Sequence, residues 1–395
     1  MPRHLRAVSF GELPVARTLA LLAKALDGTG DALLPVPPHA AGRAGLASLE
    51  PGTPLLDGED DDADPTALVV STSGSTGPPK GALLTASALR ASNAATATRL
   101  EGPGTWLLAL AAHHVAGAQV LVRSQLAGTV PEVVDLANGL SPNAFAQSTD
   151  RLVRRAGGRR YTSLVPTQLL RLLDAGDESL TALSSYDAVL VGAALTPPAL
   201  LARARDAGVR VVTTYGMSET CGGCVYDGEP LGGVQVAIED GRVLLGGAVV
   251  ARGYRLRPGA PEFVERAGAR WFRTDDLGSV DGGRLTVTGR ADDVIVTGGL
   301  KVWPAAVEAV LTDLPEVSEC VVVGVLDDEW GATVVAVVVP SDPVKPPVLQ
   351  SLRAAVTAQL DAAAAPRRLV LVPQLPLRGP GKVDRTAAGV LARGH

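Results

Sequence analysis

The sequence predicts an α/β protein with a large N-terminal body of mixed sheets and a small C-terminal α+β domain. Short β-branched runs alternate with helical segments through most of the chain. The composition then changes after Gly289-Arg290, and a second set of strands and helices follows. A chain of 395 residues is also long enough for two or three domains. We therefore expect a large catalytic domain at residues 1–290 and a smaller, mobile domain at residues 291–395.

Composition narrows the class of protein. Hydrophobic residues make up 46% of the chain and charged residues 19%, which is a globular composition. The net charge of -5 argues against a nucleic-acid or anionic-membrane partner, because either would normally require a basic face. The three cysteines are too few for a disulfide framework and favour a cytoplasmic location. Oligomeric state is left open, with a homodimer as one possibility.

The elements of the body follow in order. Leu13–Leu26 has apolar residues at helical spacing and does not resemble a signal peptide. The acidic run from Asp57 to Pro65 is expected to be a solvated loop. Thr66–Val70 predicts a buried strand, residues 71–81 a loop, and Thr85 onward a helix. Trp106–Val122 is apolar but interrupted, and it predicts a buried strand and turn rather than a membrane span.

Further elements complete the body and the second domain. We expect strands at Leu107–Ala111, Ala188–Val191, Val209–Thr213 and Val234–Ile238, and helices at Leu169–Asp174 and Pro198–Asp206. In the second domain we expect strands at Asp293–Val296, Glu319–Val325 and Thr333–Val339, and helices at Pro304–Leu314 and Pro347–Ala363.

The strongest chemical signal is the segment Ser71-Thr-Ser-Gly-Ser-Thr-Gly-Pro-Pro-Lys-Gly81. Its glycines allow backbone N–H groups to converge on an anion, its hydroxyls add donors, and Lys80 adds a positive charge. A flexible Ser/Gly linker is the alternative, but a linker would not need flanking buried structure or a stiffening Pro-Pro pair. The spacing also differs from that of an ordinary P-loop. The segment therefore predicts a phosphate-binding loop.

This loop resembles that of the adenylate-forming family of acyl-CoA synthetases, peptide-synthetase adenylation domains and luciferases. Four further motifs of that family recur in order: Thr214-Tyr-Gly-Met-Ser-Glu-Thr220, Phe272-Arg-Thr-Asp-Asp-Leu-Gly278, Gly289-Arg-Ala-Asp-Asp-Val-Ile295 and Pro376-Leu-Arg-Gly-Pro-Gly-Lys-Val-Asp384. Ser218 stands where the family usually has threonine, and Asp275 where it has glycine. The resemblance covers roughly residues 66–390 and implies a body shortened at its N-terminus.

The resemblance implies a nucleotide site for ATP and magnesium. Glu219 would carry the magnesium ion, Ser218 would contact the α-phosphate, and Tyr215 would stack on adenine. Asp276 and Arg290 would hold the ribose hydroxyls, for which an acceptor and a donor are suitable chemistry. The remaining nucleotide contacts would come from the phosphate loop and from the end of strand 188–191, through Thr72, Ser73, Gly74, Ser75, Thr76, Gly77, Lys80, Gly192, Ala193 and Ala194.

The resemblance also implies two half-reactions at one site. Lys382 would bridge the acid and the α-phosphate during adenylation. Asp292 would be the hinge about which the small domain turns, bringing Gly298 and Gly299 to the channel for coenzyme A, the co-substrate. Without the motif, Lys382 would be interpreted as an ordinary solvated lysine.

Two other patterns have competing interpretations. Cys221-Gly-Gly-Cys224 has redox or metal spacing, but no second cysteine pair or histidine lies near it in the sequence, and small residues there would line an acyl pocket. Lone histidines are usually structural. The family nevertheless has a histidine guarding the acyl pocket at the position of His113-His114, and we favour His114.

Within the family, Ala111–Arg123, Ser163–Gln168 and Gly298–Pro304 most resemble o-succinylbenzoate–CoA ligases of menaquinone biosynthesis. That resemblance implies Arg123 as the partner of the carboxylate that is not adenylated. The alternative for Arg123 is a surface arginine at a strand end. Other possible functions are another aryl or acyl acid–CoA ligase, an adenylation domain that acylates a carrier protein, or an inactive nucleotide-binding protein. Retention of Lys80, Glu219, Asp276, Arg290 and Lys382 argues against the last.

Overall fold

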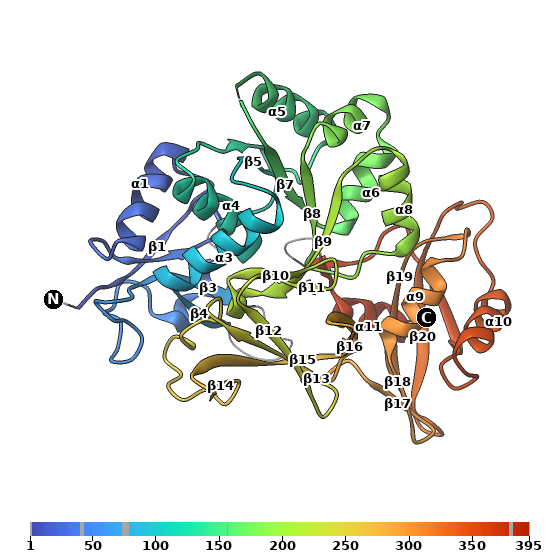
Figure 1. Ribbon diagram of the computed structural model, residues 1–395. Helices are drawn as coiled ribbons and strands as arrows, with labels where there is room; N and C mark the ends of the chain where they lie inside the picture. The colour runs from blue at the N-terminus through green and yellow to red at the C-terminus, as the bar shows by residue number, and fades with distance from the viewer. Residues whose placement is uncertain (1, 40–42, 73–78, 156, 379–381, 395) are drawn as a thin grey trace.

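The computed structural model describes residues 2–39, 43–72, 79–155, 157–378 and 382–394. Figure 1 shows three groups of elements in the body, with the C-terminal elements gathered on one side of them. This mixed α/β architecture, a large body with a small C-terminal unit, confirms the predicted fold class. None of the described helices is both long and apolar enough to cross a membrane.

The first sheet contains the strands on either side of the predicted phosphate loop. Its order is β1 (Leu5–Val8), β2 (Ala32–Pro35), β3 (Thr66–Thr72) and β4 (Lys80–Thr85), all parallel except the β3–β4 pair. Helix α1 (Val15–Leu26) connects β1 to β2, and a 3₁₀ turn, η1 (Ala47–Leu49), precedes β3. Helix α3 (Ala86–Arg99) follows β4 directly, and the Thr85 side chain caps it by accepting a hydrogen bond from the Ala88 N–H at 3.2 Å.

The prediction of one long loop between a strand and a helix at residues 71–81 was therefore wrong. The segment joins two antiparallel strands, and β4 intervenes before the helix. The β3 prediction of Thr66–Val70 was two residues short, because Ser71 and Thr72 pair with Gly81 and Lys80 and continue the ladder.

A seven-stranded sheet forms the centre of the body. Its order is β11 (Glu229–Pro230), β10 (Gly222–Tyr226), β9 (Val211–Met217), β8 (Ala188–Val191), β7 (Arg160–Leu164), β5 (Thr105–Leu108) and β6 (Glu132–Val133). Strands β5 to β9 run parallel, while β10 and β11 turn back antiparallel. The helices of this layer are α4 (Val115–Leu126), α5 (Pro142–Arg155), α6 (Pro166–Asp174), α7 (Asp177–Ser184) and α8 (Pro198–Asp206).

The predictions for β8 and α8 were confirmed to the residue, whereas others were displaced. Strand β5 begins and ends earlier than the predicted Leu107–Ala111, and β9 runs later than the predicted Val209–Thr213. The interpretation of 106–122 as strand and turn was wrong in its second half, because residues from Val115 onward form α4. Arg123 accordingly lies on a helix and not at a strand end.

The third sheet closes the body below the other two in Figure 1. Its strands are β12 (Val234–Glu239), β13 (Arg242–Gly247), β15 (Ala269–Asp281) and β14 (Phe263–Arg266), with β16 (Arg284–Arg290) paired to the far part of β15. The long β15 therefore has β13 and β14 on its first half and β16 on its second half.

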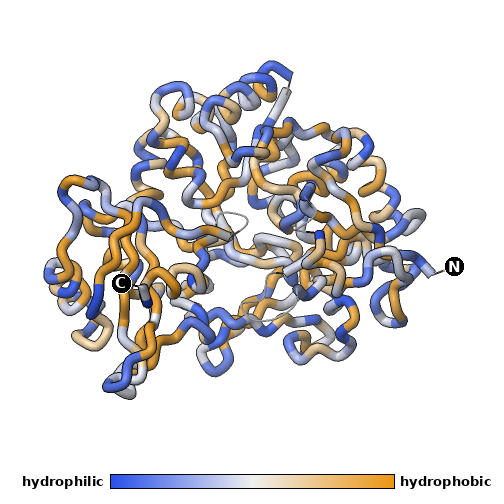
Figure 2. The backbone as a smooth tube through the Cα atoms, turned by 180° about the vertical axis from the view of Figure 1, so that it is seen from behind, coloured by the Kyte–Doolittle hydropathy of each residue, from blue (hydrophilic) through white to orange (hydrophobic). Residues whose placement is uncertain are grey.

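The C-terminal elements form smaller sheets with three helices. They are β17 (Ile295–Thr297), β18 (Leu300–Val302), α9 (Pro304–Thr312), β19 (Val317–Asp327), β20 (Gly331–Pro340), α10 (Leu349–Gln359), β21 (Arg368–Leu371), β22 (Leu377–Arg378), β23 (Lys382–Val383) and α11 (Arg385–Arg393). Each predicted element of this part is present within a few residues. Figure 2 shows hydrophobic backbone along the strands at this end of the molecule.

The buried apolar residues fall into separate groups. Two clusters draw only on residues between Ile295 and Ala392, while the others draw only on residues between Leu5 and Leu285. Each part of the chain therefore buries a core of its own.

The acidic run before β3 is structural and not merely solvated, which corrects the prediction. Glu59 is 6% exposed and forms an ion pair with the fully buried Arg255. Asp60 pairs with Arg3 at 3.0 Å, and Asp64 accepts hydrogen bonds from Ser87 at the start of α3. These carboxylates tie the N-terminal segment to the body.

Candidate active site

The phosphate-loop residues that the structure describes lie at the ends of two paired strands. Thr72 ends β3, Lys80 begins β4, and the two are partners in the ladder. Ser73, Gly74, Ser75, Thr76 and Gly77 lie outside the described residues. The connection between Thr72 and Lys80 is therefore anchored at both ends by one hairpin.

Lys80 makes two contacts with segments far along the chain. Its Nζ donates to Glu262 Oε1 at 2.7 Å, and it lies 5.1 Å from the centre of the Tyr254 ring. Burial raises the pKa of the Glu262 carboxyl, but the hydrogen bond and the charges of Lys80 and Arg257 outweigh burial and hold this pKa below its usual range.

Glu219 and Ser218 lie in a short 3₁₀ turn, η2 (Ser218–Thr220), which follows β9 directly. Glu219 is only 6% exposed, and its Oε1 accepts a hydrogen bond from the Tyr254 hydroxyl at 2.6 Å. Burial and the neighbouring Glu219 charge raise the pKa of Tyr254, so this tyrosine remains a donor. No cluster of three or more potential metal ligands occurs among the residues that the structure describes.

Tyr215, Asp276 and Arg290 come together as the motif order predicts. The Tyr215 hydroxyl donates to Asp276 Oδ2 at 2.7 Å, and Arg290 Nη1 lies 3.4 Å from Asp276 Oδ1. Asp276 and Arg290 are partners in the β15–β16 ladder, which explains their proximity. Arg290 also forms a two-pronged pair with Asp292, at 2.9 Å and 3.0 Å. The candidate hinge residue is thus bonded to a candidate nucleotide residue.

Gly192, Ala193 and Ala194 follow β8 at its carboxyl end. A side chain at Gly192 would collide with Thr214 on the adjacent β9, so only glycine allows this approach. Ala193 has a positive φ of 71°, which is uncommon for a residue with a side chain. Ligands of parallel sheets bind beyond the carboxyl ends of strands, and this segment lies at such an end.

His114 precedes α4, and Arg123 lies within it. His114 is the residue before the helix, and its ring lies 4.3 Å from that of His113, whose pKa is lowered by burial and by nearby His39. Arg123 is 4% exposed, which excludes the surface interpretation. Its Nη2 donates to Thr96 Oγ1 at 3.2 Å and to the Tyr226 hydroxyl at 3.3 Å.

The buried face of α4 carries unsatisfied polar atoms. Arg123 Nε and Gln119 Oε1 are buried and lack hydrogen-bond partners among the described residues. The amide nitrogen of Gln119 donates to the backbone oxygen of Cys221, two residues beyond Glu219. These two side chains are one helical turn apart, so they share a face of α4 beside the segment after the Glu219 motif.

The two closely spaced cysteines belong to that segment. Cys221 and Cys224 are free thiols, 0% and 1% exposed, within the core. Burial raises the pKa of both thiols, that of Cys224 to about 12, so neither is a ready thiolate. Gly222 lies between them and directly faces Gln119.

The residues expected to serve the second half-reaction lie elsewhere. Gly298 and Gly299 form the turn between β17 and β18, with positive φ values of 55° and 77°. Figure 1 shows this hairpin apart from β9, at the lower end of the C-terminal part. Lys382 begins β23 and pairs with Arg378; its side chain lies outside what the structure describes.

Two residues that lie in the candidate site are not part of any of the five sequence motifs. Tyr254 contacts both Lys80 and Glu219, and Glu262 is the carboxylate partner of Lys80. Neither lies in one of the five motifs. Their roles depend on the connection between β13 and β14, which returns beside β4, and local sequence does not reveal this packing.

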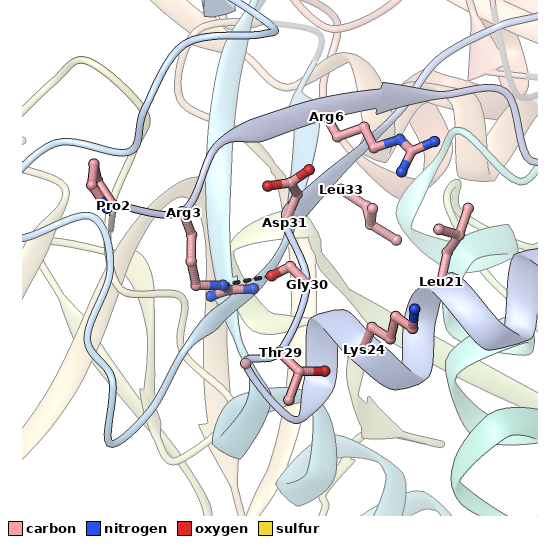
Figure 3. A pocket seen from close by; sticks show the side chains of 10 residues that line it. Pro2, Arg3, Arg6, Leu21, Lys24, Thr29, Gly30, Asp31 and Leu33 are labelled. Atoms are coloured by element: carbon pink, nitrogen blue, oxygen red, sulfur yellow. Dashed lines mark hydrogen bonds between the residues drawn. The ribbon is translucent and has the colours of Figure 1, made fainter.

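Two cavities lie outside the residues predicted for the site. One of about 470 Å³ lies beside β1, β2 and α1 and is lined by Arg3, Arg6, Lys24 and Asp31 among others, as Figure 3 shows. Arg3 in its wall is held by the Gly30 carbonyl at 2.7 Å. A second cavity of about 310 Å³ includes Tyr254 and Arg257 in its lining.

Comparison with known proteins defines the class. The chain belongs to the AMP-binding enzyme family, whose model matches residues 33–255. The model for the C-terminal domain of AMP-binding enzymes matches residues 306–382.

The chain is similar in sequence and in structure to 2-succinylbenzoate–CoA ligases. The chain is 48% identical over 376 residues to a probable 2-succinylbenzoate–CoA ligase of Mycobacterium tuberculosis, covering 94% of each chain. It is 26% identical to the o-succinylbenzoate CoA synthetase MenE of Bacillus subtilis, solved with the acyl-adenylate OSB-AMP, with a TM-score of 0.71 over 97% of this chain and 82% of that one. The same synthetase in complex with ATP and magnesium gives a TM-score of 0.69 at 26% identity, over 96% and 83% of the chains.

Proposed function

We propose that this chain is an ATP-dependent, AMP-forming acid–CoA ligase whose acid is o-succinylbenzoate, the activity that feeds menaquinone biosynthesis. The family, and the name of a relative 48% identical over nearly the whole chain, support this assignment. The reaction first joins the acid to AMP with release of pyrophosphate, and then transfers the acyl group to coenzyme A. The unpaired cysteines support a cytoplasmic location, where ATP and coenzyme A are available.

The nucleotide is assigned to the groups around β9. Lys80 and the loop after Thr72 take the outer phosphates, Ser218 the α-phosphate, and Glu219 the magnesium ion, which neutralises charge that develops during transfer. Tyr215 offers its ring to adenine because its hydroxyl is already engaged by Asp276. Asp276 and Arg290 take the ribose, and the backbone of Gly192 to Ala194 flanks the nucleotide.

The assignment of the acid depends on Arg123. Its guanidinium is buried, its neighbours Thr96, Tyr226 and Trp106 are all uncharged, and its Nε has no partner among the described residues. A buried charge without a counter-charge is costly. An aryl carboxylate that stays ionised while the succinyl carboxylate reacts would satisfy it, with forked hydrogen bonds. His114, at the start of the same helix, borders the acid.

The second half-reaction is assigned to movement of the C-terminal part. We place the domain division after Arg290, supported by the separate apolar cores on its two sides. Asp292 serves as the hinge, Lys382 serves adenylation, and the Gly298-Gly299 turn serves the coenzyme A channel. A swap of this kind lets one site perform two chemically different steps.

A substrate comparison tests the proposed function. AMP release that depends on coenzyme A is measured with o-succinylbenzoate, with benzoylpropionate, which is the same molecule without the aryl carboxylate, and with feruloyl-type and simple aryl acids. We expect kcat/KM for the diacid to exceed that for benzoylpropionate by about 10²-fold, because the buried Arg123 rejects an uncharged ring. Equal use of both acids would contradict the proposed substrate, and acylation of a carrier protein in place of coenzyme A would contradict the ligase.

A further inference from the structure

We propose that Glu262 is a positioning residue for the phosphate-loop lysine. It holds Lys80 against Tyr254, and the phosphates of ATP must replace Glu262 as the partner of Lys80. The proposal rests on the proposed function, since it assumes that Lys80 binds phosphate. The carboxylate that competes with phosphate for Lys80 comes from a segment outside the five motifs.

The first observation is how firmly Glu262 itself is placed. It lies directly before β14, and its backbone carbonyl accepts a hydrogen bond from the Arg273 N–H on β15 at 2.7 Å. One carboxylate oxygen accepts the Lys80 ammonium at 2.7 Å. The other oxygen is buried and has no hydrogen-bond partner among the described residues. Among the described residues, Lys80 is the side chain that donates a hydrogen bond to this carboxylate.

The second observation is that Tyr254 connects this pair to Glu219. The Tyr254 ring lies below Lys80, is braced edge-on by Phe263 at 5.0 Å between ring centres, and donates its hydroxyl to Glu219. An ammonium over an aromatic face is favourable, so the ring supports the same position of Lys80. The phosphate-loop lysine and the candidate magnesium carboxylate thus share one neighbour.

The third observation is that the pair can exchange partners. The side chains of Lys80 and Glu262 are 31% and 24% exposed, so solvent and an incoming phosphate reach them. Partly exposed ion pairs are weak, whereas a lysine on a multiply charged phosphate gains more. Glu262 therefore sets the position of Lys80 and lowers the affinity for ATP and pyrophosphate, which eases release of pyrophosphate after adenylation.

The test compares ATP and pyrophosphate binding by the full-length protein and its Glu262→Gln variant, in the absence of acid and coenzyme A. Glutamine keeps the shape and removes the charge. We expect both ligands to bind about two- to fivefold tighter, because the ion pair that opposes their binding is partly exposed and therefore weak. Thermal unfolding, measured alongside, checks that the variant is folded. Unchanged or weaker binding by the folded variant would overturn the proposal.

A second comparison separates action through Lys80 from simple charge repulsion. In a Lys80→Met background, Glu262→Gln should leave ATP and pyrophosphate binding unchanged, because the competition is gone. The same tightening in that background would overturn the proposal. Glu265→Gln is the matched control: Glu265 lies three residues on, in β14, 63% exposed and paired with Arg270, and its loss should leave binding unchanged.

Failure of the proposal for Glu262 and failure of the proposed function would give different results. If the wild type fails to turn over o-succinylbenzoate, the proposed acid is wrong, while the binding results for Glu262 stand. If the wild type binds neither ATP nor pyrophosphate, both proposals are overturned.

Discussion

Arg123 is the residue on which the proposed choice of substrate depends. Arg123→Leu removes the charge, together with the guanidinium that lies over the Trp106 ring at 5.0 Å from its centre. We expect kcat/KM for o-succinylbenzoate to fall by about 10²-fold or more, since removing one partner of a buried charge pair costs about 3–5 kcal/mol. Benzoylpropionate turnover and the KM for ATP should hardly change, because neither ligand presents a carboxylate to this position. An equal loss on both acids would mean that Arg123 supports the fold and not the substrate.

At the residue scale, the sequence predicted contacts between residues of the five motifs and missed the contacts of residues outside those motifs. Tyr215, Asp276 and Arg290 were predicted together and lie together, because ladder pairing of β15 with β16 carries the last two into contact. The contacts of Tyr254 and Glu262 depend on sheet packing, which no local pattern encodes. The roles assigned to the motif residues stay proposals that the variants test.

Among the elements, the β17–β18 hairpin has a turn that tolerates little change. A side chain at Gly298, whose φ is 55°, would come within 2.9 Å of the Trp330 ring, and the Gly298 N–H donates to the Trp330 carbonyl at 2.9 Å. We expect Gly298→Ala to displace the turn and to slow thioester formation from acyl-AMP by about 10-fold or more, while sparing adenylation, because positive φ and the clash both oppose alanine.

Gly283 supplies the control for this change. It forms the β15–β16 turn with a φ of 81°, and a Cβ at this position would meet no atom within 4 Å. Gly283→Ala therefore carries the same backbone cost without a clash and should leave thioester formation unchanged. If both variants slow that step alike, local contact with Trp330 is not what positions the Gly298 turn.

The segment between β16 and β17 holds the proposed hinge. Proline at position 292 would fix φ near about -65° and hinder rotation. Because Asp292 also binds Arg290 through two hydrogen bonds, Asp292→Pro removes an ion pair as well. Asp292→Ala removes the same ion pair but leaves the backbone free to rotate. We expect the proline variant, compared with alanine, to lose about 10-fold in thioester formation and little in adenylation. Identical behaviour of the two variants would show that the carboxylate, and not backbone rotation, matters.

Short apolar runs were predictable as strands even where they are fully buried, whereas a buried helix was not recognised. Ala188–Val191 alternates between two apolar clusters, with Ala188 and Leu190 in one and Val189 and Val191 in the other. Helix α4 is buried from Gly117 through Ser124, so it lacks the solvent-exposed polar face whose period would indicate a helix. Strand β4 was missed because it joins α3 without an intervening turn.

For the whole molecule, the separate cores on either side of Arg290 fit a body and a mobile part that share one site. The body is braced internally, as the buried pair of Arg255 and Glu59 shows. Between the two parts, the described polar contacts include the Arg290–Asp292 pair, which lies at the proposed hinge itself. Such an arrangement suits two half-reactions that need different segments of the small part.

Separate assays of the two half-reactions on Lys382→Ala test that two-step scheme most directly. Adenylation is followed by o-succinylbenzoate-dependent exchange of pyrophosphate into ATP, and thioester formation is followed from preformed acyl-AMP and coenzyme A. In the proposed scheme Lys382 adds a positive charge at the α-phosphate only in the first step, so we expect adenylation to fall by about 10²–10³-fold. Thioester formation should stay within about twofold of the wild type, because that step does not use Lys382. A parallel loss of both half-reactions, or of neither, would contradict the scheme.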